Sequence, residues 1–355
     1  MISVSRNLIC LDIGSQNIHI IQGKYNKGSI VVRDAIECPI EEGVFLDGRI
    51  EDFSSLRQSI RRILTINRIK GRNAVITTQS TSVITRDILL PMAERKQLDN
   101  MVKYEIEQYL PIVASEYVVE YSVQGETIED GVSKYKVQVA AMPKNMVGNL
   151  ANLIRECGLK PVALDLHSNA AAKLFSNRVS INGELFNTEK THALIDLGHH
   201  SITIHILHME KLVFSRIINL GAREIDNELA LDFNLSLEQA EKKKIQETNL
   251  NPDDFDEYMS DQCNDIIRSK VDIWLSEIQK IFQYYISRTT GNRINGIYLM
   301  GGASGLKGLS RYVEQALNMK TQTINGLDIV KPGKMVSEFN PRKYINALGG
   351  LIRHE

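Results

Sequence analysis

The chain has 355 residues, of which 43% are hydrophobic and 24% charged, and its formal net charge is −1. These values are typical of a globular protein with two domains and give no sign of nucleic acid or anionic lipid as a partner. Four scattered cysteines without a CxxC pair argue against a zinc site and a disulfide framework. No stretch approaches the roughly 20 apolar residues of a spanning helix, and the first residues do not resemble a signal peptide. We therefore expect a cytoplasmic protein.

The N-terminal part of the chain predicts strands followed by a helix. Residues 8–36 predict three successive strands, the first two separated by a turn at Gly14. Apolar residues recur at helical spacing over 55–67, which indicates an amphipathic helix. Further strands are expected at 73–79 and 81–90 because both segments are rich in β-branched residues.

Residues 80–145 predict a compact α+β unit inserted between elements of the first domain. Pro91 is expected to open a helix that runs to Leu110, before a second proline. Residues 117–143 follow as an antiparallel strand pair around a polar turn, and a helix is expected at 144–158.

The second half of the chain restarts the opening pattern. A strand and a helix at 161–175 lead into a polar connection at 177–191, where we place the main domain boundary. A strand–turn–strand segment then begins at 192, as at the N-terminus, which indicates a diverged internal duplication. The later elements are helices at 236–249 and 261–288, a strand at 297–302 and a small-residue helix at 344–352.

Two glycine-bearing segments share one plan, in which Asp-x-Gly lies between two strands. LICLDIGSQNIHIIQG contains Asp12 and Gly14, and HALIDLGHHSITIHIL contains Asp196 and Gly198. One such motif is usually only a turn, but two equivalent copies can face each other around a phosphate chain. Glycine lets backbone N–H groups approach phosphate oxygens, and two facing aspartates can hold Mg²⁺ largely through water. A third segment, IYLMGGASGLKGLS, suits a base, ribose or α-phosphate contact.

The order of these segments resembles the phosphate-1, phosphate-2 and adenosine motifs of the actin, Hsp70 and sugar-kinase superfamily. ALDLHSNAAAKLF and INALGGLI lie where its connecting helices belong, so the resemblance covers nearly the whole chain. EIEQYLPI, ALDLH and MGGASGLKGL are most similar to the PilM family of type IV pilus assembly proteins, which is related to FtsA. The resemblance implies an α/β fold of duplicated actin-like (ribonuclease H-like) domains with a 1C-type α+β insertion. The implied subdomains are 1A at 1–79 and 146–185, 1C at 80–145, 2A at 186–221 and 290–355, and 2B at 222–289.

The resemblance also implies a site for ATP or ADP with Mg²⁺, in which Asp12 and Asp196 would face the metal. The implied nucleotide-binding residues are Asp12, Gly14, Ser15, Gln16, Asn17, His19, Asp196, Gly198, His199, His200, Ser201, Gly221, Gly301, Gly302, Ala303 and Ser304. Glu241 and Lys244 resemble the AExxK helix of subdomain 2B and would touch ribose or base; the alternative is a solvated charged helix face.

The first phosphate motif departs from its relatives. They often carry a lysine where this chain has His19, and an imidazole is shorter and mostly neutral at pH 7. Alternatively, His19 merely packs on the hairpin. Asp165, His167 and Asn169 lie where a water-positioning residue would be, and Asp165 is the candidate catalytic residue, or only orients the turn. We expect ATP binding with slow or negligible hydrolysis.

Histidines cluster around the second motif and raise the question of a metal site. On a strand–turn–strand segment they alternate between both faces, and no cysteine completes a tetrahedral set, which disfavours zinc. These histidines are His192, His199, His200, His205 and His208.

As a member of the PilM family, the chain would bind the N-terminal cytoplasmic tail of the inner-membrane protein PilN. It would thereby be recruited to the inner face of the cytoplasmic membrane and link PilN to the pilus motor ATPases. The peptide would lie between subdomains 1A and 1C, along the helix at 94–110. The candidate contacts are Met101, Ile106, Tyr109 and Leu110, unless these residues simply form the core.

Two other functions are compatible with the superfamily. An FtsA-like division protein typically ends in a linker and an amphipathic membrane helix, and we expect none after GGLIRHE. A small-molecule kinase would need a catalytic aspartate in a sugar cleft and large 1B-type substrate elements, which are not evident.

Overall fold

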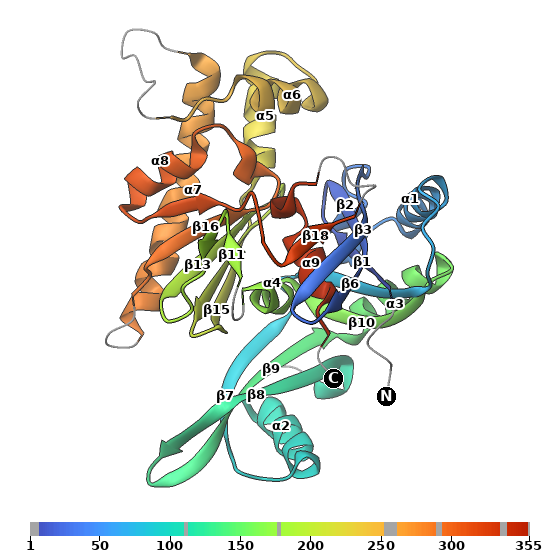
Figure 1. Cartoon of the computed structure of the whole chain (residues 1–355), viewed down its shortest axis with the longest axis vertical. Helices are drawn as coiled ribbons and strands as arrows, with labels where there is room; N and C mark the ends of the chain where they lie inside the picture. The colour runs from blue at the N-terminus through green and yellow to red at the C-terminus, as the bar shows by residue number, and fades with distance from the viewer. Residues whose placement is uncertain are drawn as a thin grey trace.

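The fold is built on two β-sheets with the same strand plan (Figure 1). The computed structural model describes residues 7–109, 113–175, 179–251, 261–288, 293–333 and 339–353. In the first sheet, β1, β2 and β3 are antiparallel, and β6 and β10 continue parallel to β1. In the second, β13, β14 and β15 are antiparallel, and β16 and β17 continue parallel to β13. The shared order supports the duplication expected from the sequence.

Most strands of the two sheets lie where the sequence predicts them, whereas β17 and β18 had no prediction. Those of the first sheet are β1 (Leu8–Ile13), β2 (Asn17–Asn26), β3 (Ser29–Pro39), β6 (Asn73–Thr78), β10 (Lys160–Leu166) and β18 (Val330–Pro332). Those of the second are β13 (Thr191–Leu197), β14 (Ile202–His208), β15 (Lys211–Ile218), β16 (Gly296–Met300) and β17 (Thr321–Thr323). Short strand pairs are β4 (Phe45–Leu46) with β5 (Arg49–Ile50), and β11 (Ser180–Ile181) with β12 (Glu184–Leu185). Because β18 pairs with β3, the C-terminal part of the chain contributes to both sheets.

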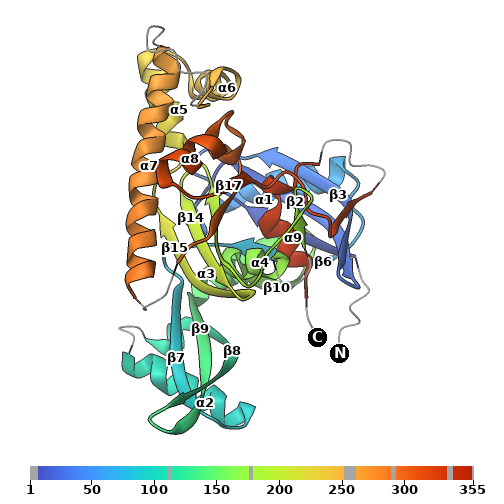
Figure 2. The ribbon, with the colours of Figure 1, turned by 60° about the vertical axis from the view of Figure 1, so that its left-hand side comes forward.

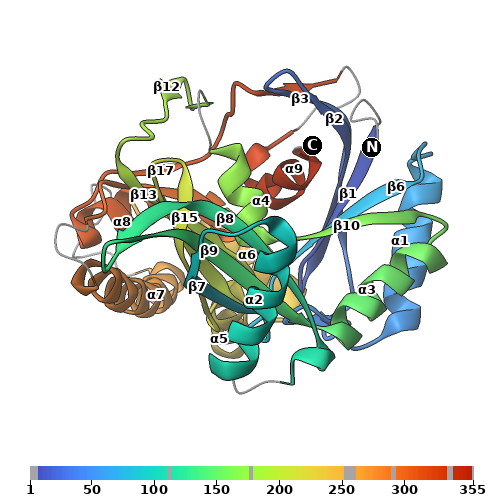
Figure 3. The same ribbon diagram turned by 90° about the horizontal axis from the view of Figure 1, so that it is seen from below.

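Helices cover both sheets and separate them (Figures 1 and 3). On the outer face of the first sheet lie α1 (Phe53–Ile66) and α3 (Lys144–Glu156). Between the sheets lie α4 (His167–Leu174) and α9 (Ile345–Leu351). On the outer face of the second lie α5 (Ala222–Asp232), α7 (Gln262–Ser287) and α8 (Leu309–Leu317), with α6 (Leu237–Glu247) packed on α5.

The close packing of α4 and α9 depends on small residues. A Cβ atom on Gly349 of α9 would lie 1.8 Å from the carbonyl oxygen of Ala170 in α4. Only a residue without a Cβ allows the two backbones to approach so closely. The small-residue helix predicted near the C-terminus therefore joins α4 between the sheets.

The inserted unit projects from the first sheet (Figures 1 and 2). It consists of β7 (Ile84–Pro91), β8 (Tyr117–Glu129) and β9 (Val132–Pro143), covered by α2 (Arg95–Tyr109), with the short 3-10 turn η1 (Ala114–Glu116) before β8. The expectation that Pro91 opens the helix is wrong, since Pro91 is the last residue of β7 and pairs with Lys134. A proline is tolerated at a strand end because its missing N–H leaves no ladder bond unmade there. Leu110 lies outside the described residues. The subdomain boundaries stay a prediction.

Candidate functional site

The two Asp-x-Gly hairpins form the same turn. The N–H of Gly14 donates to the carbonyl oxygen of Asn17 at 2.9 Å, and the N–H of Gly198 donates to that of Ser201 at 3.0 Å. A Cβ on Gly198 would lie 2.7 Å from the Ser201 oxygen, so the turn has no room for a side chain. Tight turns of this kind present backbone N–H groups that bind phosphate oxygens.

Strand alternation directs both aspartates into the space between the sheets. Asp12 shares its face of β1 with Cys10, which packs in the core around α4 and α9. Asp196 shares its face of β13 with Leu194, which packs in the same core. Because successive side chains of a strand point to opposite faces, the two carboxylates converge on one region.

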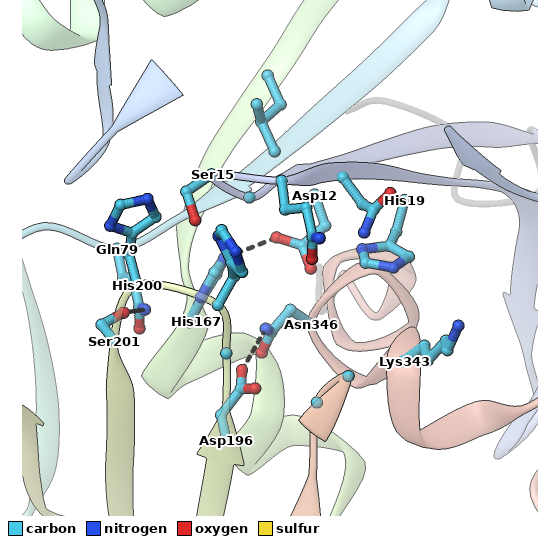
Figure 4. Close-up of a pocket in the computed structure, with 18 of the residues that line it drawn as sticks. Asp12, Ser15, His19, Gln79, His167, Asp196, His200, Ser201, Lys343 and Asn346 are labelled. Atoms are coloured by element: carbon cyan, nitrogen blue, oxygen red, sulfur yellow. Dashed lines mark hydrogen bonds and ion pairs between the residues drawn. The ribbon is translucent and has the colours of Figure 1, made fainter. Parts of the chain in front are cut away.

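A pocket between the two sheets collects most of the predicted residues (Figure 4). Those that line it are Asp12, Gly14, Ser15, Gln16, Asn17, His19, Asp196, Gly198, His199, His200, Ser201, Gly301 and Gly302. Predicted residues outside its lining are Asp165, Gly221, Glu241, Lys244, Ala303 and Ser304. The three motifs are therefore brought together in space, while the AExxK-like helix is not part of this wall.

Asp12 is bound by a histidine from α4. Nε2 of His167 lies 2.7 Å from Oδ1 of Asp12, and both side chains are buried. Burial favours a neutral carboxyl, but the His167 charge and hydrogen bond outweigh it and lower the pKa of Asp12. Burial likewise opposes the charged imidazole, and Asp12 outweighs it and raises the pKa of His167.

Asp196 is bound by an asparagine from α9. Nδ2 of Asn346 donates to Oδ2 of Asp196 at 3.0 Å. Burial raises the pKa of Asp196, and the negative charge of Asp12 adds to the rise. Gly301 lies directly against this carboxylate, since a Cβ there would be 2.3 Å from Oδ1, and its φ is +86°. Both the contact and the left-handed backbone require glycine at this position.

His19, at the position of the expected lysine, faces an acidic partner. Its Nε2 lies 3.5 Å from Oε1 of Glu37, and Nζ of Lys343 lies 2.8 Å from the other carboxylate oxygen. The His19 hydrogen bond and the Lys343 charge together lower the pKa of Glu37 to about 2. Lys343, from the 3-10 turn η4 (Pro341–Lys343), lines the pocket and brings a cation that the sequence reasoning missed.

Gln79 connects the first sheet to the second hairpin. Its Nε2 donates to Oγ of Ser201 at 3.1 Å, and its Oε1 accepts from Oγ1 of Thr203 at 2.6 Å. An ion pair between Arg223 of α5 and Glu42, after β3, joins the same two halves. The pocket is thus bordered by contacts that hold its two sides together.

Sequence reasoning missed several lining residues besides Lys343. Gln79 follows β6, Arg342 lies in η4, and Asn346 is the second residue of α9. Asn346 belongs to the segment that resembles a connecting helix, INALGGLI, which is the available signal for it, whereas Arg342 lies before that segment. Gln79 lies in no recognisable motif, and a polar residue after a strand is too common to indicate a site.

Lys244 is buried in an ion pair and does not itself line the pocket. Its Nζ lies 2.6 Å from Oδ1 of Asp226 in α5, and Nε2 of His199 lies 3.8 Å from the same carboxylate. Gly221 has an extended backbone, and a Cβ there would lie 2.3 Å from the His199 carbonyl oxygen. Gly221 therefore packs directly against the backbone of the turn at Gly198–Ser201. Glu241 lies one turn before Lys244, partly exposed.

Asp165 lies in a separate charged cluster. It is paired with Lys173, lies 3.2 Å from Nη1 of Arg353, and accepts from Nδ2 of Asn169 at 2.6 Å. Lys173 also donates to the carbonyl oxygen of Ile352 at 2.9 Å. These contacts hold the end of α9 against α4, so the surroundings of Asp165 indicate a structural role.

The third motif forms a turn after β16. After β16, Gly301 and Gly302 lead into a 3-10 turn, η3 (Ala303–Gly305), and α8 begins only at Leu309. Ser304 is buried, and its hydroxyl donates to the Gly301 carbonyl oxygen at 2.7 Å.

The other histidines are dispersed. His192 packs against Phe186 and Tyr298, Nδ1 of His205 lies 3.0 Å from Oγ of Ser215, and His208 contacts a threonine. Within the described ranges, no three His, Cys, Asp or Glu side chains are arranged to hold a metal ion by themselves.

The predicted peptide-contact residues divide between core and surface. Ile106 is 3% exposed in the core of the inserted unit, and Met101 packs partly against that core. Tyr109 is 66% exposed. Leu110 lies outside the described residues.

Solved structures with this arrangement share the actin-like ATPase fold. The chain superposes on a "PilM-PilN type IV pilus biogenesis complex" with a TM-score of 0.80 at 20% identity, covering 98% of each chain. EutJ from Carboxydothermus hydrogenoformans gives 0.55 at 14% identity, covering 97% of this chain and 88% of that one. MreB5 of Spiroplasma citri bound to ADP gives 0.55 at 12% identity, covering 97% and 95%.

The described part of the chain contains no helix long and apolar enough to cross a membrane. The family model for the type IV pilus assembly protein PilM matches residues 10–349. With almost the whole chain matched and the same fold in the superposed complex, this chain belongs to the PilM family of type IV pilus assembly proteins.

Proposed function

We propose that the chain is a nucleotide-binding scaffold of the type IV pilus inner-membrane platform, with ATP or ADP held between its two Asp-x-Gly hairpins. The observation that carries this proposal is that two equivalent turns, Gly14–Asn17 and Gly198–Ser201, line one pocket. Facing turns of this kind suit a phosphate chain. Actin-like MreB5 has been solved with ADP and with AMPPNP.

Buried polar atoms in the pocket support a polar ligand. Nδ1 of His199 and Oδ1 of Asn346 are buried and lack a hydrogen-bond partner within the described structure. Because buried polar groups normally find partners, these atoms fit a site that a polar ligand completes. Arg342 and Lys343 add two cations on the same wall, suited to phosphate charge.

The acidic residues of the pocket fit an oxygen-liganded cation. Asp12 and Asp196 would hold Mg²⁺, because carboxylates and water are its preferred ligands. The negative charge of Asp12 contributes to the raised pKa of Asp196, so the two carboxylates repel each other, and a divalent cation would relieve that repulsion. When bound, the metal would neutralise phosphate charge.

Hydrolysis is proposed to be slow or negligible. Asp165, the candidate catalytic residue, is held by Lys173 and Arg353 outside the pocket lining. His167 lines the pocket but is bound to Asp12. A single-turnover ATPase assay with rates like those of a sugar kinase would contradict this part of the proposal.

The nucleotide site is tested by a substitution that adds a side chain inside one of the two turns. Gly198→Ala places a Cβ 2.7 Å from a backbone oxygen, whereas Gly148→Ala, in α3, meets nothing within 4 Å. We expect calorimetric titration with ADP to show at least about tenfold weaker binding for Gly198→Ala and unchanged binding for Gly148→Ala. Equal affinities, or no binding of ADP or ATP by the unmodified chain, would overturn the nucleotide site.

The second part of the proposal is that the chain binds the N-terminal cytoplasmic tail of PilN and is thereby recruited to the inner face of the cytoplasmic membrane. Its support is family membership and the superposed PilM-PilN complex. The inserted unit offers exposed apolar side chains on α2, Tyr104 and Tyr109, and just before it, Met92. Such residues suit pockets for alternate side chains of an extended peptide.

Peptide binding is tested by fluorescence anisotropy with a labelled peptide of the PilN N-terminus. Tyr109→Ala is expected to weaken binding by about tenfold or more, because an exposed aromatic side chain is a frequent hot spot. Leu231→Ala, in α5, removes a side chain that is also largely exposed but lies on another element, and should leave affinity unchanged. The remaining part of the proposal is that the chain contacts the pilus motor ATPases. It is tested by asking whether the motor ATPases co-purify with PilN only when this chain is present.

A further inference from the structure

Two hydrogen-bond donors are held against Asp12 and Asp196, two of the acidic residues that line the pocket. Nε2 of His167 lies 2.7 Å from Asp12, and Nδ2 of Asn346 lies 3.0 Å from Asp196. Both donor side chains are buried, and Asn346 lies between Asp196 and Asp12 in the view of Figure 4. Each carboxylate therefore already has a protein partner, and both donors also line the pocket.

We propose that His167 and Asn346 compete with a divalent cation for Asp12 and Asp196, so that nucleotide binding by this chain depends only weakly on Mg²⁺. The inference rests on the proposed nucleotide site. His167 occupies Oδ1 of Asp12 and Asn346 occupies Oδ2 of Asp196, so a cation that used either of these oxygens would have to displace the donor from it. Hydrogen bonds to charged groups are among the stronger ones. Magnesium also demands nearly ideal octahedral geometry and gives up its waters reluctantly, which increases the cost of displacement.

The two donors cannot withdraw easily, because of where the fold places them. His167 is the first residue of α4, and Asn346 is the second residue of α9. These helices lie between the sheets and pack closely where Gly349 meets Ala170. A side chain at the start of such a helix is fixed by the packing of the whole helix, so the donors are preorganised on their carboxylates.

The same donors offset the negative charge that a phosphate chain would otherwise meet. Without a partner, Asp12 and Asp196 would repel phosphate oxygens at short range. With His167 and Asn346 in place, and with Lys343 and Arg342 on the wall, the site can accept a nucleoside diphosphate without a metal ion.

The first test uses Mg²⁺ alone and measures the thermal midpoint of unfolding with and without MgCl₂, at constant ionic strength set with KCl. His167→Leu removes the donor, and His167→Gln keeps an amide donor. We expect a clearly larger Mg²⁺-dependent rise in the midpoint for His167→Leu than for the unmodified chain or His167→Gln, since a metal stabilises a site that it can enter. Equal rises in all three proteins would overturn the proposal.

Two further variants keep this test decisive. His205→Leu removes another buried histidine, whose contact is Ser215, and should show the same Mg²⁺ response as the unmodified chain. If His167→Leu does not fold, Asn346→Ala replaces it, because it removes the donor at Asp196. A Mg²⁺ response of Asn346→Ala no larger than that of the unmodified chain then counts against the proposal.

The second test is ADP affinity by calorimetry in EDTA and in MgCl₂. We expect the affinity of the unmodified chain for ADP to differ by no more than about threefold between EDTA and MgCl₂. His167→Leu should lose at least about tenfold in ADP affinity in EDTA and regain that affinity in MgCl₂. Binding of the unmodified chain in MgCl₂ but not in EDTA would overturn the inference while leaving the nucleotide site intact. No ADP binding under either condition would instead overturn the proposed function, and the metal-only experiment would still decide the inference.

Discussion

Lys244 of α6 and Asp226 of α5 form a buried ion pair, with 2.6 Å between Nζ and Oδ1. Both residues are at most 5% exposed. Burial raises the pKa of Asp226, and the Lys244 charge opposes this rise. The pair ties the two helices together next to His199, which belongs to the second phosphate-like turn.

Removing one partner of this pair should strongly destabilise the protein. Lys244→Met is expected to lower the free energy of unfolding by about 3–5 kcal/mol, because it leaves a buried carboxylate without its counterion. Urea denaturation measures the effect. Lys242→Met, in the exposed pair with Glu238, is the matched control and should change stability little. A Lys244→Met protein as stable as this control would contradict a structural role for the ion pair.

The crossing of α4 and α9 should not tolerate a single added methyl group. Gly349→Ala places a Cβ 1.8 Å from the Ala170 carbonyl oxygen, and we expect a loss of about 3 kcal/mol or more from overpacking. Gly148→Ala makes the same chemical change in an exposed helix interior, where nothing lies within 4 Å. It should stabilise the protein by about 0.5–1 kcal/mol. Denaturant unfolding measures the change in the free energy of unfolding for both variants. Changes of the same sign in the two variants would contradict this packing.

His205 should make stability fall as the solution is acidified. Burial, with the positive charge of His167 adding to it, lowers the pKa of His205 from 6.5 to about 3. Between these values the unfolded chain binds a proton that the native chain does not, so stability rises with pH in this window. The contribution of His205 to the free energy of unfolding should therefore fall by about 2 kcal/mol between pH 7 and pH 5.

The test compares His205→Gln, which cannot titrate, with the unmodified chain. Free energies of unfolding at pH 7, 6 and 5 should fall less steeply for His205→Gln. Parallel slopes for the two proteins would show that His205 does not stay neutral in the native state.

Asp165 should matter for stability and not for nucleotide binding. Asp165→Asn deprives Lys173 of its carboxylate partner in a buried setting, and we expect a loss of about 3 kcal/mol in unfolding free energy. Glu184→Gln, which breaks an exposed pair with Lys320, should have no measurable effect. ADP affinity of folded Asp165→Asn should equal that of the unmodified chain, and a large loss of affinity would place Asp165 in the site.

Local patterns predicted the elements well because their causes are local. The turns at Gly14 and Gly198, and the helices α3 and α7, follow from residue types and spacing that act within a few positions. The start of α2 was placed too early because Pro91 suits both a helix start and a strand end. Its pairing with Lys134, distant in the sequence, decided between them.

The sequence by itself determined the duplicated hairpins, the α/β class and the side chains that each hairpin presents, since alternation along a strand is fixed by backbone geometry. Only the tertiary structure decided which side chains meet. Asn346 reaches Asp196, and Lys244 pairs with Asp226 beside His199. These contacts depend on how two sheets close over α4 and α9, and residues far apart in the chain carry no local signal of such a meeting.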